Sequence, residues 1–233
     1  DDLHQIPELG FEEFKTSAYL ADKLEAMGYK VTRNIGGTGV IGEIKGSEPG
    51  PVMMLRADMD ALPFLIDGEK KNIHACGHDA HSAMLLAAAS ELVGKVKRGT
   101  LRILFQQGEE TLTGALAVID AGVIEDVDIA LGLHIRPVQD IAYGEMSPAV
   151  RHASSTFVNV VINGLSSHGA RPHLGVNAIE AAAVAINAIT AIKINPIIPW
   201  SCKVTGIKGG GVAPNIIPDK VEMIVDARAQ TKL

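Results

Sequence analysis

The sequence lacks the features that would point to a membrane span, a nucleic acid partner or a disulfide-stapled scaffold. No run of about 18 uncharged apolar residues occurs in it, so a transmembrane helix is not expected. Acidic residues outnumber basic ones, 27 to 21, which argues against a basic face for nucleic acid or anionic lipid. The only cysteines, Cys76 and Cys202, form no disulfide framework, and a reducing cytoplasm is the simplest expectation.

Aromatic residues are also scarce, at 4% of the sequence, so the core must be built from Ala, Val, Ile and Leu. Hydrophobic residues make up 47% and charged residues 21%, which is the composition of a globular protein and excludes disorder as its main state. A length of 233 residues accommodates one large domain or two small ones.

The first part of the chain, residues 1–148, alternates helix-like and strand-like segments. Apolar residues spaced three and four apart predict helices over 11–27, 80–95 and 112–121. Short apolar runs predict strands over 39–45, 51–57, 101–106 and 128–135. This alternation predicts an α/β domain built of β-α-β units around a mostly parallel sheet.

The second part, residues 149–233, has a different pattern. Polar and apolar residues alternate over 155–162, 202–207 and 220–227, as in strands with one solvated face, and an Ala- and Ile-rich helix is predicted over 177–193. The order β-α-β-β predicts an α+β sandwich whose last helix and strand are absent. We therefore expect the natural polypeptide to continue beyond Leu233.

Residues with metal-binding and acid–base chemistry gather in four segments that follow predicted strands or precede helices. They are RADMDALP (56–63), HACGHDAH (74–81), GEE (108–110) and LHIRP (133–137). Loops at the carboxyl ends of parallel strands meet at one edge of a sheet, so these segments are expected to converge. Thiolate and imidazole ligands, such as Cys76 and His78, suit a borderline-soft ion such as zinc. Either residue alone would more simply be a buried thiol or a solvated imidazole.

The adjacent carboxylates Glu109 and Glu110 end a predicted strand, so they should point to opposite sides of the chain. One would bind a metal while the other takes a proton from a water whose pKa the metal lowers. The alternative is a solvated acidic turn. Asp58, Asp60, Asp79 and His81 could orient a ligand histidine, or cap turns. His4, His152 and His173 are expected to be structural, and Cys202 to be a small core residue.

The chain resembles the metal-dependent aminoacylase/carboxypeptidase family, in particular its amidohydrolase branch of N-acyl-amino-acid amidohydrolases, hippurate hydrolases and plant auxin-conjugate hydrolases. The resemblance covers nearly the whole chain, in the family's order. It is carried by HQIPELGFEE, LRADMDALP, IHACGHDAHSAM, FQQGEE, LHIRP, SSHGARPHLGVNAIEAA and GGGVAPNIIPD. Two departures stand out: Gln107-Gly108 replaces the usual Pro-Ala before the two glutamates, and the segment between Leu62 and His74 is shorter than usual.

The resemblance implies a zinc-exopeptidase-like catalytic domain, of which residues 1–148 are the N-terminal part. Residues 149–233 would form an incomplete, inserted ferredoxin-like lid that dimerises. Two divalent metal ions, zinc or manganese with cobalt also possible, would be held by Cys76, His78, Glu110 and His134 and by a histidine beyond Leu233. Glu109 would be the general base. His168 would reach a partner's active site in a homodimer, and Asn215 and Arg228 would hold substrate oxygens.

The function that the resemblance implies is hydrolysis of the amide bond of N-acyl amino acids or related small amides. A dipeptidase or exopeptidase with the same machinery is the first alternative. A non-catalytic dimerising or binding protein is the second, if the C-terminal metal ligand is truly absent. From the sequence alone, His168 and the glycines before Asn215 are equally well explained as plain turns.

Overall fold

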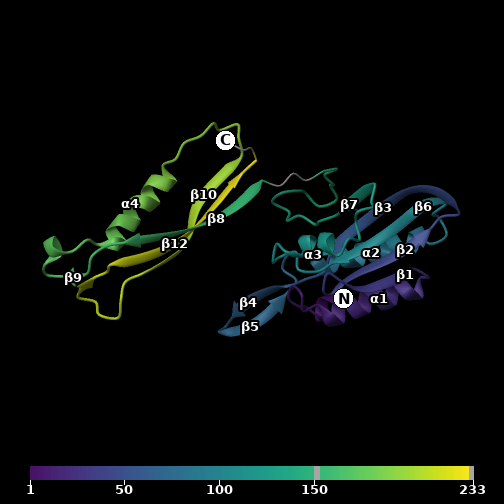
Figure 1. Cartoon of the computed structure of the whole chain (residues 1–233), viewed down its shortest axis with the longest axis horizontal. Coiled ribbons are helices and arrows are strands. Elements are labelled where there is room, and N and C mark those ends of the chain that lie inside the picture. The colour runs from purple at the N-terminus through teal and green to yellow at the C-terminus, as the bar shows by residue number, and fades with distance from the viewer. Residues whose placement is uncertain (150–152, 231–233) are drawn as a thin grey trace. The chain divides into compact units, whose positions relative to one another are not determined.

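The computed structural model describes residues 1–149 and 153–230. The chain divides into two compact units, Asp1–Glu145 and Met146–Leu233, here called unit 1 and unit 2 (Figure 1). His152 and residues 231–233, which carry some of the expectations above, lie outside the described residues. None of the helices described is long and apolar enough to cross a membrane.

Unit 1 is built on a five-stranded sheet with the strand order β1-β2-β6-β3-β7. Its strands are β1 (Lys30–Ile35), β2 (Gly39–Lys45), β3 (Glu48–Asp58), β6 (Arg98–Gln106) and β7 (Ile129–Gly132). β3 pairs in parallel with β6 and β7, whereas β2 pairs antiparallel with β1 and β6. The prediction of a mostly parallel sheet is therefore wrong, and the sheet is mixed. The cause is that β1, β2 and β3 follow one another without a helix between them, and β2 runs antiparallel to both β1 and β6. The sequence pattern does not predict β1, because only one of its residues is buried.

Helices cover both faces of this sheet. α1 (Phe14–Ala26) and α2 (His78–Leu92) pack through Leu20, Leu24 and Leu85 against one face, where Ile103 and Phe105 of β6 point. The short α3 (Gly114–Asp120) packs through Val118 against Leu104 on the other face. Successive side chains of a strand point to opposite faces, so β6 supplies both cores. All of β6 beyond Thr100 is buried, as the apolar run LRILFQ predicts.

The first two helices begin at positions that matter for the site. α1 begins at Phe14 rather than Phe11, because Phe11 adopts a left-handed conformation (φ 66°) and the Glu8 carboxylate accepts hydrogen bonds from the N–H groups of Lys15 and Thr16, each at 2.9 Å. α2 begins at His78 rather than Ala80. His78 and His81 are thus three residues apart in one helix and share a face.

A hairpin formed by β4 (Leu62–Ile66) and β5 (Glu69–Ile73) fills the shortened segment between Leu62 and His74. Its turn residues, Asp67 and Gly68, both have positive φ angles, as a two-residue hairpin turn of this kind requires. The hairpin projects from unit 1 (Figure 1) and was not predicted, because LPFLI and EKKNI show no clean alternation.

Unit 2 is an antiparallel sheet with the strand order β10-β12-β8, and one helix packs on it. Its main elements are β8 (Ser154–Asn163), α4 (Ala178–Thr190), β10 (Trp200–Gly209) and β12 (Lys220–Ala229), as the sequence predicts with shifted ends. Two small strands, β9 (Ser167–His168) and β11 (Ile216–Ile217), pair with each other. β12 lies between the two strands that α4 connects, which is a split β-α-β unit.

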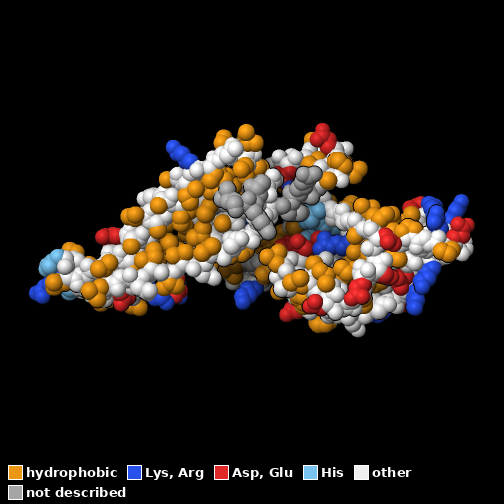
Figure 2. Space-filling view, turned by 45° about the horizontal axis from the view of Figure 1, so that its top comes forward, with side chains coloured by type: hydrophobic (Ala, Val, Ile, Leu, Met, Phe, Trp, Pro, Cys, Tyr) orange, Lys and Arg blue, Asp and Glu red, His pale blue; other side chains and the backbone are white. Residues whose placement is uncertain are grey.

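The sheet of unit 2 buries only one face. Val160 and Met223 pack against α4, so their neighbours Val161 and Ile224 point away and are about half exposed. Hydrophobic side chains cover much of the visible face of unit 2 (Figure 2). Within the described residues, β8 and β10 are outer strands whose second edges pair with no other strand.

Candidate metal centre

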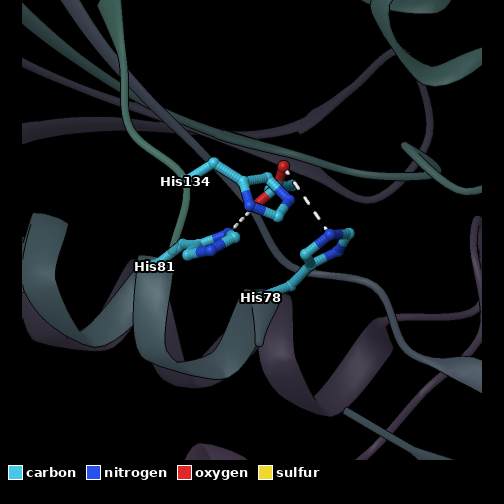
Figure 3. A group of neighbouring side chains, drawn as sticks. His78, His81 and His134 are labelled. Atoms are coloured by element: carbon cyan, nitrogen blue, oxygen red, sulfur yellow. Dashed lines mark hydrogen bonds and ion pairs between the residues drawn. The ribbon is translucent and has the colours of Figure 1, made fainter. Parts of the chain in front are cut away.

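The candidate residues of unit 1 meet at one edge of its sheet. β3 ends at Asp58, β6 ends just before the Gly108–Glu110 turn, and β7 ends just before His134. These three strands are parallel, so their carboxyl ends face the same way. His78 and His81 project from the first turns of α2 toward His134, which comes from the loop after β7 (Figure 3).

His78 is fully buried and has one ring nitrogen without a partner. Its Nδ1 lies 3.0 Å from Asp60 Oδ1, to which it donates, and this leaves the Nε2 lone pair free. Nε2 faces three carboxylates: Glu110 Oε1 at 3.7 Å, Asp58 Oδ2 at 3.8 Å and Glu109 Oε2 at 3.9 Å. A histidine that donates Nδ1–H to a carboxylate and turns Nε2 toward a metal is the usual arrangement in metalloproteins.

Cys76 and His134 lie beside it, and the His134 ring is held in a similar way. The Sγ of Cys76 lies 3.4 Å from Nε2 of His134, whose Nδ1–H donates to the carbonyl of Ile135 at 2.6 Å. The ligand atoms of Cys76, His78 and Glu110 all lie within 4.8 Å of one another. Tetrahedral coordination at ordinary Zn–N and Zn–S distances separates ligand atoms by about 3.4–3.8 Å, so these spacings suit a shared ion.

Two of the unpartnered buried atoms among the described residues belong to this group. They are His78 Nε2 and Glu110 Oε1. A buried polar atom without a hydrogen bond is costly, and a cation between the two would satisfy both. The combination of sulfur, nitrogen and carboxylate donors suits a divalent ion of borderline softness. The residues present therefore fit a metal centre.

Glu109 lies beside the ligands and remains partly exposed to solvent. Burial raises the pKa of Glu109, and the neighbouring charge of Glu110 raises it further. Both glutamates approach His78 because β6 ends at Gln106 and the chain then turns, with Leu112 N–H donating to Glu109 O. The expectation that they point to opposite sides, which assumed an extended chain, is wrong.

His81 belongs to the cluster but both of its ring nitrogens are in use. The Ile135 N–H donates to Nε2 at 2.9 Å, so the proton lies on Nδ1 and is donated to Asp58 at 2.5 Å. His81 thus ties α2, the end of β3 and the His134 loop together without offering a lone pair to a metal. Asp60 has a similar role, because its Oδ2 accepts the Glu110 N–H at 2.9 Å. Asp79, in contrast, hydrogen-bonds to His4 at 2.8 Å, and this bond involves none of the candidate ligands.

The charges of this cluster shift its pKa values strongly. Burial raises the pKa of the Cys76 thiol to about 12, together with the negative charges of Glu110 and Glu109. Burial alone would lower the pKa of His78, but the hydrogen bond to Asp60 and the charge of Asp58 outweigh it, and the pKa is raised. Without an ion the centre is therefore an acidic cluster that holds protons, which a metal would displace.

The sequence pattern does not single out Gly77 or Glu13, and it marks Gln107 only as a departure from the family, yet all three shape the centre. Gly77 has a positive φ of 82° just before α2, and a Cβ there would collide with Cδ1 of Ile135. The Gln107 amide donates to Gly36 O at 2.8 Å. Glu13 is fully buried and accepts the Gly108 N–H at 2.8 Å. A Gly before a helix start is a weak signal of this kind, and no pattern around Glu13 distinguishes it from a solvated glutamate.

The residues predicted in unit 2 are only partly brought together. His168 pairs with Ile216 across β9 and β11, and Gly169 N–H donates to Asn215 O at 2.7 Å, so His168 and Asn215 are neighbours. Arg228 lies near the C-terminal end of β12. Lys220, the first residue of β12 and the one nearest to Asn215 in sequence, is about 26 Å away along the strand. Arg228 is exposed and forms an ion pair with Asp226 at 3.0 Å.

Comparisons with known proteins agree with this geometry. The family model described as peptidase family M20/M25/M40 matches residues 54–223. The chain is 38% identical to thermostable carboxypeptidase 1 of Saccharolobus solfataricus, over 95% of this chain and 60% of that protein. It is 37% identical to the hippurate hydrolase of Campylobacter jejuni, over 97% of this chain and 62% of that protein.

Among solved structures, a dinuclear metal-binding peptidase of the M20 family from Bacillus subtilis is 32% identical, with a TM-score of 0.78. The match covers 99% of this chain and 62% of that one. The chain thus spans about 60% of the length of these relatives.

Proposed function

Because the chain belongs to peptidase family M20/M25/M40, we propose that it is part of a metal-dependent amidohydrolase that cleaves N-acyl amino acids or related small amides. The observation that carries this proposal is the unpartnered Nε2 of buried His78, which faces Glu109, Glu110 and Asp58. The similarity to hippurate hydrolase supports an acylated amino acid as the substrate class.

Two divalent ions are proposed as cofactors, held by Cys76, His78, Glu110 and His134. The thiolate of Cys76 favours zinc, while the carboxylate and imidazole ligands also suit manganese or cobalt. Bound ions would lower the pKa of a water molecule and polarise the scissile carbonyl. The dinuclear site of the Bacillus subtilis relative supports this number of ions.

Within the chain itself, Glu109 is the proposed general base. Its carboxylate borders the ligands, is partly open to solvent, and has a pKa raised by burial and by the charge of Glu110. It would take the proton of the attacking water and return it to the leaving amine. During turnover, Asp60 would keep the His78 ring and the Glu110 backbone in their positions through its two hydrogen bonds.

The test is hydrolysis by the full-length protein of a panel of N-acetyl and N-benzoyl amino acids set against free dipeptides. We expect release of the acyl group, loss of activity on chelation, and recovery when zinc or manganese is returned. Preferential cleavage of peptides would favour a carboxypeptidase-like activity, to which the similarity to thermostable carboxypeptidase 1 also points. A metal-loaded protein that cleaves neither class would favour the non-catalytic alternative.

Residues 149–233 are proposed as a lid domain that forms a homodimer. The open edges of β8 and β10 and the exposed apolar face of the sheet support this assignment. In this arrangement His168 would stabilise a developing oxyanion in the partner's site, and Asn215 and Arg228 would hold substrate oxygens. Mixing inactive His168→Ala protein with inactive Glu109→Gln protein should then restore activity. A mixture that stays inactive despite proven subunit exchange would rule out the shared site.

A reducing compartment such as the cytoplasm is proposed as the location. Both cysteines are free, and a metal-binding Cys76 has to stay reduced. Oxidation of Cys76 by mild peroxide should abolish metal binding in the purified protein.

A further inference from the structure

The segment Leu9–Glu13 lies between two of the loops that build the centre. Leu9 forms a β-bridge with Ala61, whose N–H donates to Glu8 O at 2.7 Å, next to Asp60. On its other side the segment touches the turn of the two glutamates. A Cβ on Gly10 would lie 2.8 Å from Cγ2 of Thr111 and 3.0 Å from Cα of Gly108. The segment is thus wedged between the Asp60 loop and the Gly108–Glu110 turn.

Glu13 ends this segment with a carboxyl group that is fully buried. Its Oε1 accepts the Gly108 N–H at 2.8 Å, and its Oε2 lies 2.5 Å from the Thr38 hydroxyl, which donates to it. Among the described residues, no Lys, Arg or His forms an ion pair with it. Burying a carboxyl group without a cation is costly, so its two hydrogen bonds are what holds it there.

The Gly108 N–H that Glu13 accepts belongs to the residue just before Glu109. Gly108 is left-handed (φ 56°), and a Cβ there would lie 2.5 Å from the Phe11 ring, so the turn is pressed against the same segment. Two residues further on, the Glu110 N–H is accepted by Asp60 at 2.9 Å. Two buried carboxyl groups therefore hold the turn at alternate N–H groups, one on each side of Glu109.

We propose that Glu13 is a positioning residue that holds the Gly108–Glu110 turn, and with it Glu109 and Glu110, in the orientation that the metal centre uses. Its effect on turnover rests on the proposed function of Glu109. Its effect on metal affinity rests only on Glu110 as a ligand. Since Glu13 contacts neither the metal ligands nor the base, it acts through the turn alone.

The central comparison is between Glu13→Ala and Glu13→Gln. In the alanine variant Gly108 N–H loses its acceptor and the turn can shift; a misplacement of about 1 Å can reduce a rate by about 100-fold. We expect kcat to fall about 10- to 100-fold with KM changed by less than about threefold, and cobalt affinity to fall about 10-fold with altered d–d absorption bands. Glutamine should restore both, because its amide oxygen can accept from Gly108 and its NH₂ can donate to Thr38.

Two further variants keep the test decisive if Glu13→Ala does not fold. Glu13→Asp retains the charge but is one methylene shorter, so it cannot reach Gly108 and Thr38 together and should be more impaired than Glu13→Gln. Tyr29→Phe is the matched control, because it removes another buried hydrogen bond, from Tyr29 Oη to Ala89 O at 2.8 Å, away from the turn. It should lower the melting temperature without changing kcat or the cobalt spectrum.

The outcomes separate this inference from the proposed function. If the full-length wild-type protein hydrolyses no amide, the proposed function fails, and cobalt affinity still tests Glu13. The inference itself is overturned if Glu13→Ala keeps both kcat and cobalt affinity within about twofold of wild type. It is equally overturned if Glu13→Gln is no better than Glu13→Asp, or if Tyr29→Phe reproduces the kinetic and spectral losses.

Discussion

The two units differ in how their candidate functional residues are held. In unit 1, buried side chains around the metal centre are joined across long stretches of sequence, His78 to Asp60, His81 to Asp58, and Glu13 to Gly108, whereas the candidate ligand His134 is exposed. In unit 2, His168 and Arg228 are exposed, and the polar contacts of their side chains within the described residues are with Ala170 and Asp226, each two positions away in sequence. Buried side chains that are hydrogen-bonded across the sequence are held in place by the fold itself, whereas exposed side chains of this kind acquire a role when something binds to them.

The largest expected effect concerns the base in unit 1. Glu109→Gln should reduce kcat by about 100- to 10,000-fold in the full-length enzyme and leave metal content unchanged, because the amide cannot take a proton. Glu110→Gln should instead lower metal content, measured by elemental analysis of dialysed protein. Loss of metal from Glu109→Gln with retention in Glu110→Gln would show that the two roles are exchanged.

Removing one buried contact of a ligand should have the next largest effect. Asp60→Asn weakens the acceptor for His78 Nδ1–H, and the loss of such an acceptor lowers metal affinity by about 10- to 100-fold. Asp79→Asn is the matched control, since Asp79 lies beside His78 in sequence but hydrogen-bonds to His4. Competition with a chromophoric chelator measures both affinities, and equal losses would contradict the distinction between these two aspartates.

Asp58 should make the metal-free protein sensitive to acid. Burial alone would raise the pKa of Asp58, but the hydrogen bond from His81 and the charge of Arg56 outweigh it and lower the pKa from 3.8 to about 2. A carboxyl whose pKa is lower in the folded state stabilises that state above its unfolded pKa, and loses this contribution as pH falls through its folded pKa.

The contribution of Asp58 to the free energy of unfolding is about 2 kcal/mol, lost between about pH 4 and pH 2. Urea unfolding of the metal-free protein between pH 6 and pH 2 should show a smaller decline for Asp58→Asn than for wild type. The exposed Asp22→Asn, which removes a partner of Arg33 at the surface, should leave the wild-type slope unchanged. If the free energies of unfolding of Asp58→Asn and of wild type declined equally as the pH falls, Asp58 would not be the cause of the acid sensitivity.

The smallest effect is expected in unit 2. Arg228→Ala removes an exposed ion pair with Asp226 and should leave the free energy of unfolding almost unchanged, because such pairs contribute little in water. If Arg228 holds substrate, the same variant should raise KM in the full-length enzyme while the melting temperature stays constant. A large loss of stability would show that unit 2 relies on Arg228 structurally, and the contrast between the two units would weaken.

The sequence predicts the residues that carry the chemistry of the centre better than it predicts the contacts that hold them in place. The resemblance matches Cys76, His78, Glu110 and His134 to the family's metal ligands, and few residue types bind metals, so these four are the predicted ligands. The helices and core strands also follow from periodicity. The antiparallel pairing of β2 with β6 joins residues far apart in sequence, and no local pattern reveals it. The geometry of the Glu109–Glu110 pair differs from the prediction because the chain turns after Gln106, where an extended chain was assumed. Glu13 and Asp60 act through backbone N–H groups of distant residues, and no local pattern reveals such partners.

Gly77 shows that the metal centre depends on the conformation of the backbone as well as on side chains. It has no side chain to bind or react with anything, yet Ile135 occupies the space above it, and Ile135 leads directly to His134 and donates to His81. Any other residue at position 77 would displace that loop and would also be strained at its positive φ angle. In a library of all single substitutions scored for growth on an acylated amino acid as sole nitrogen source, position 77 should therefore tolerate as little variation as the ligands themselves.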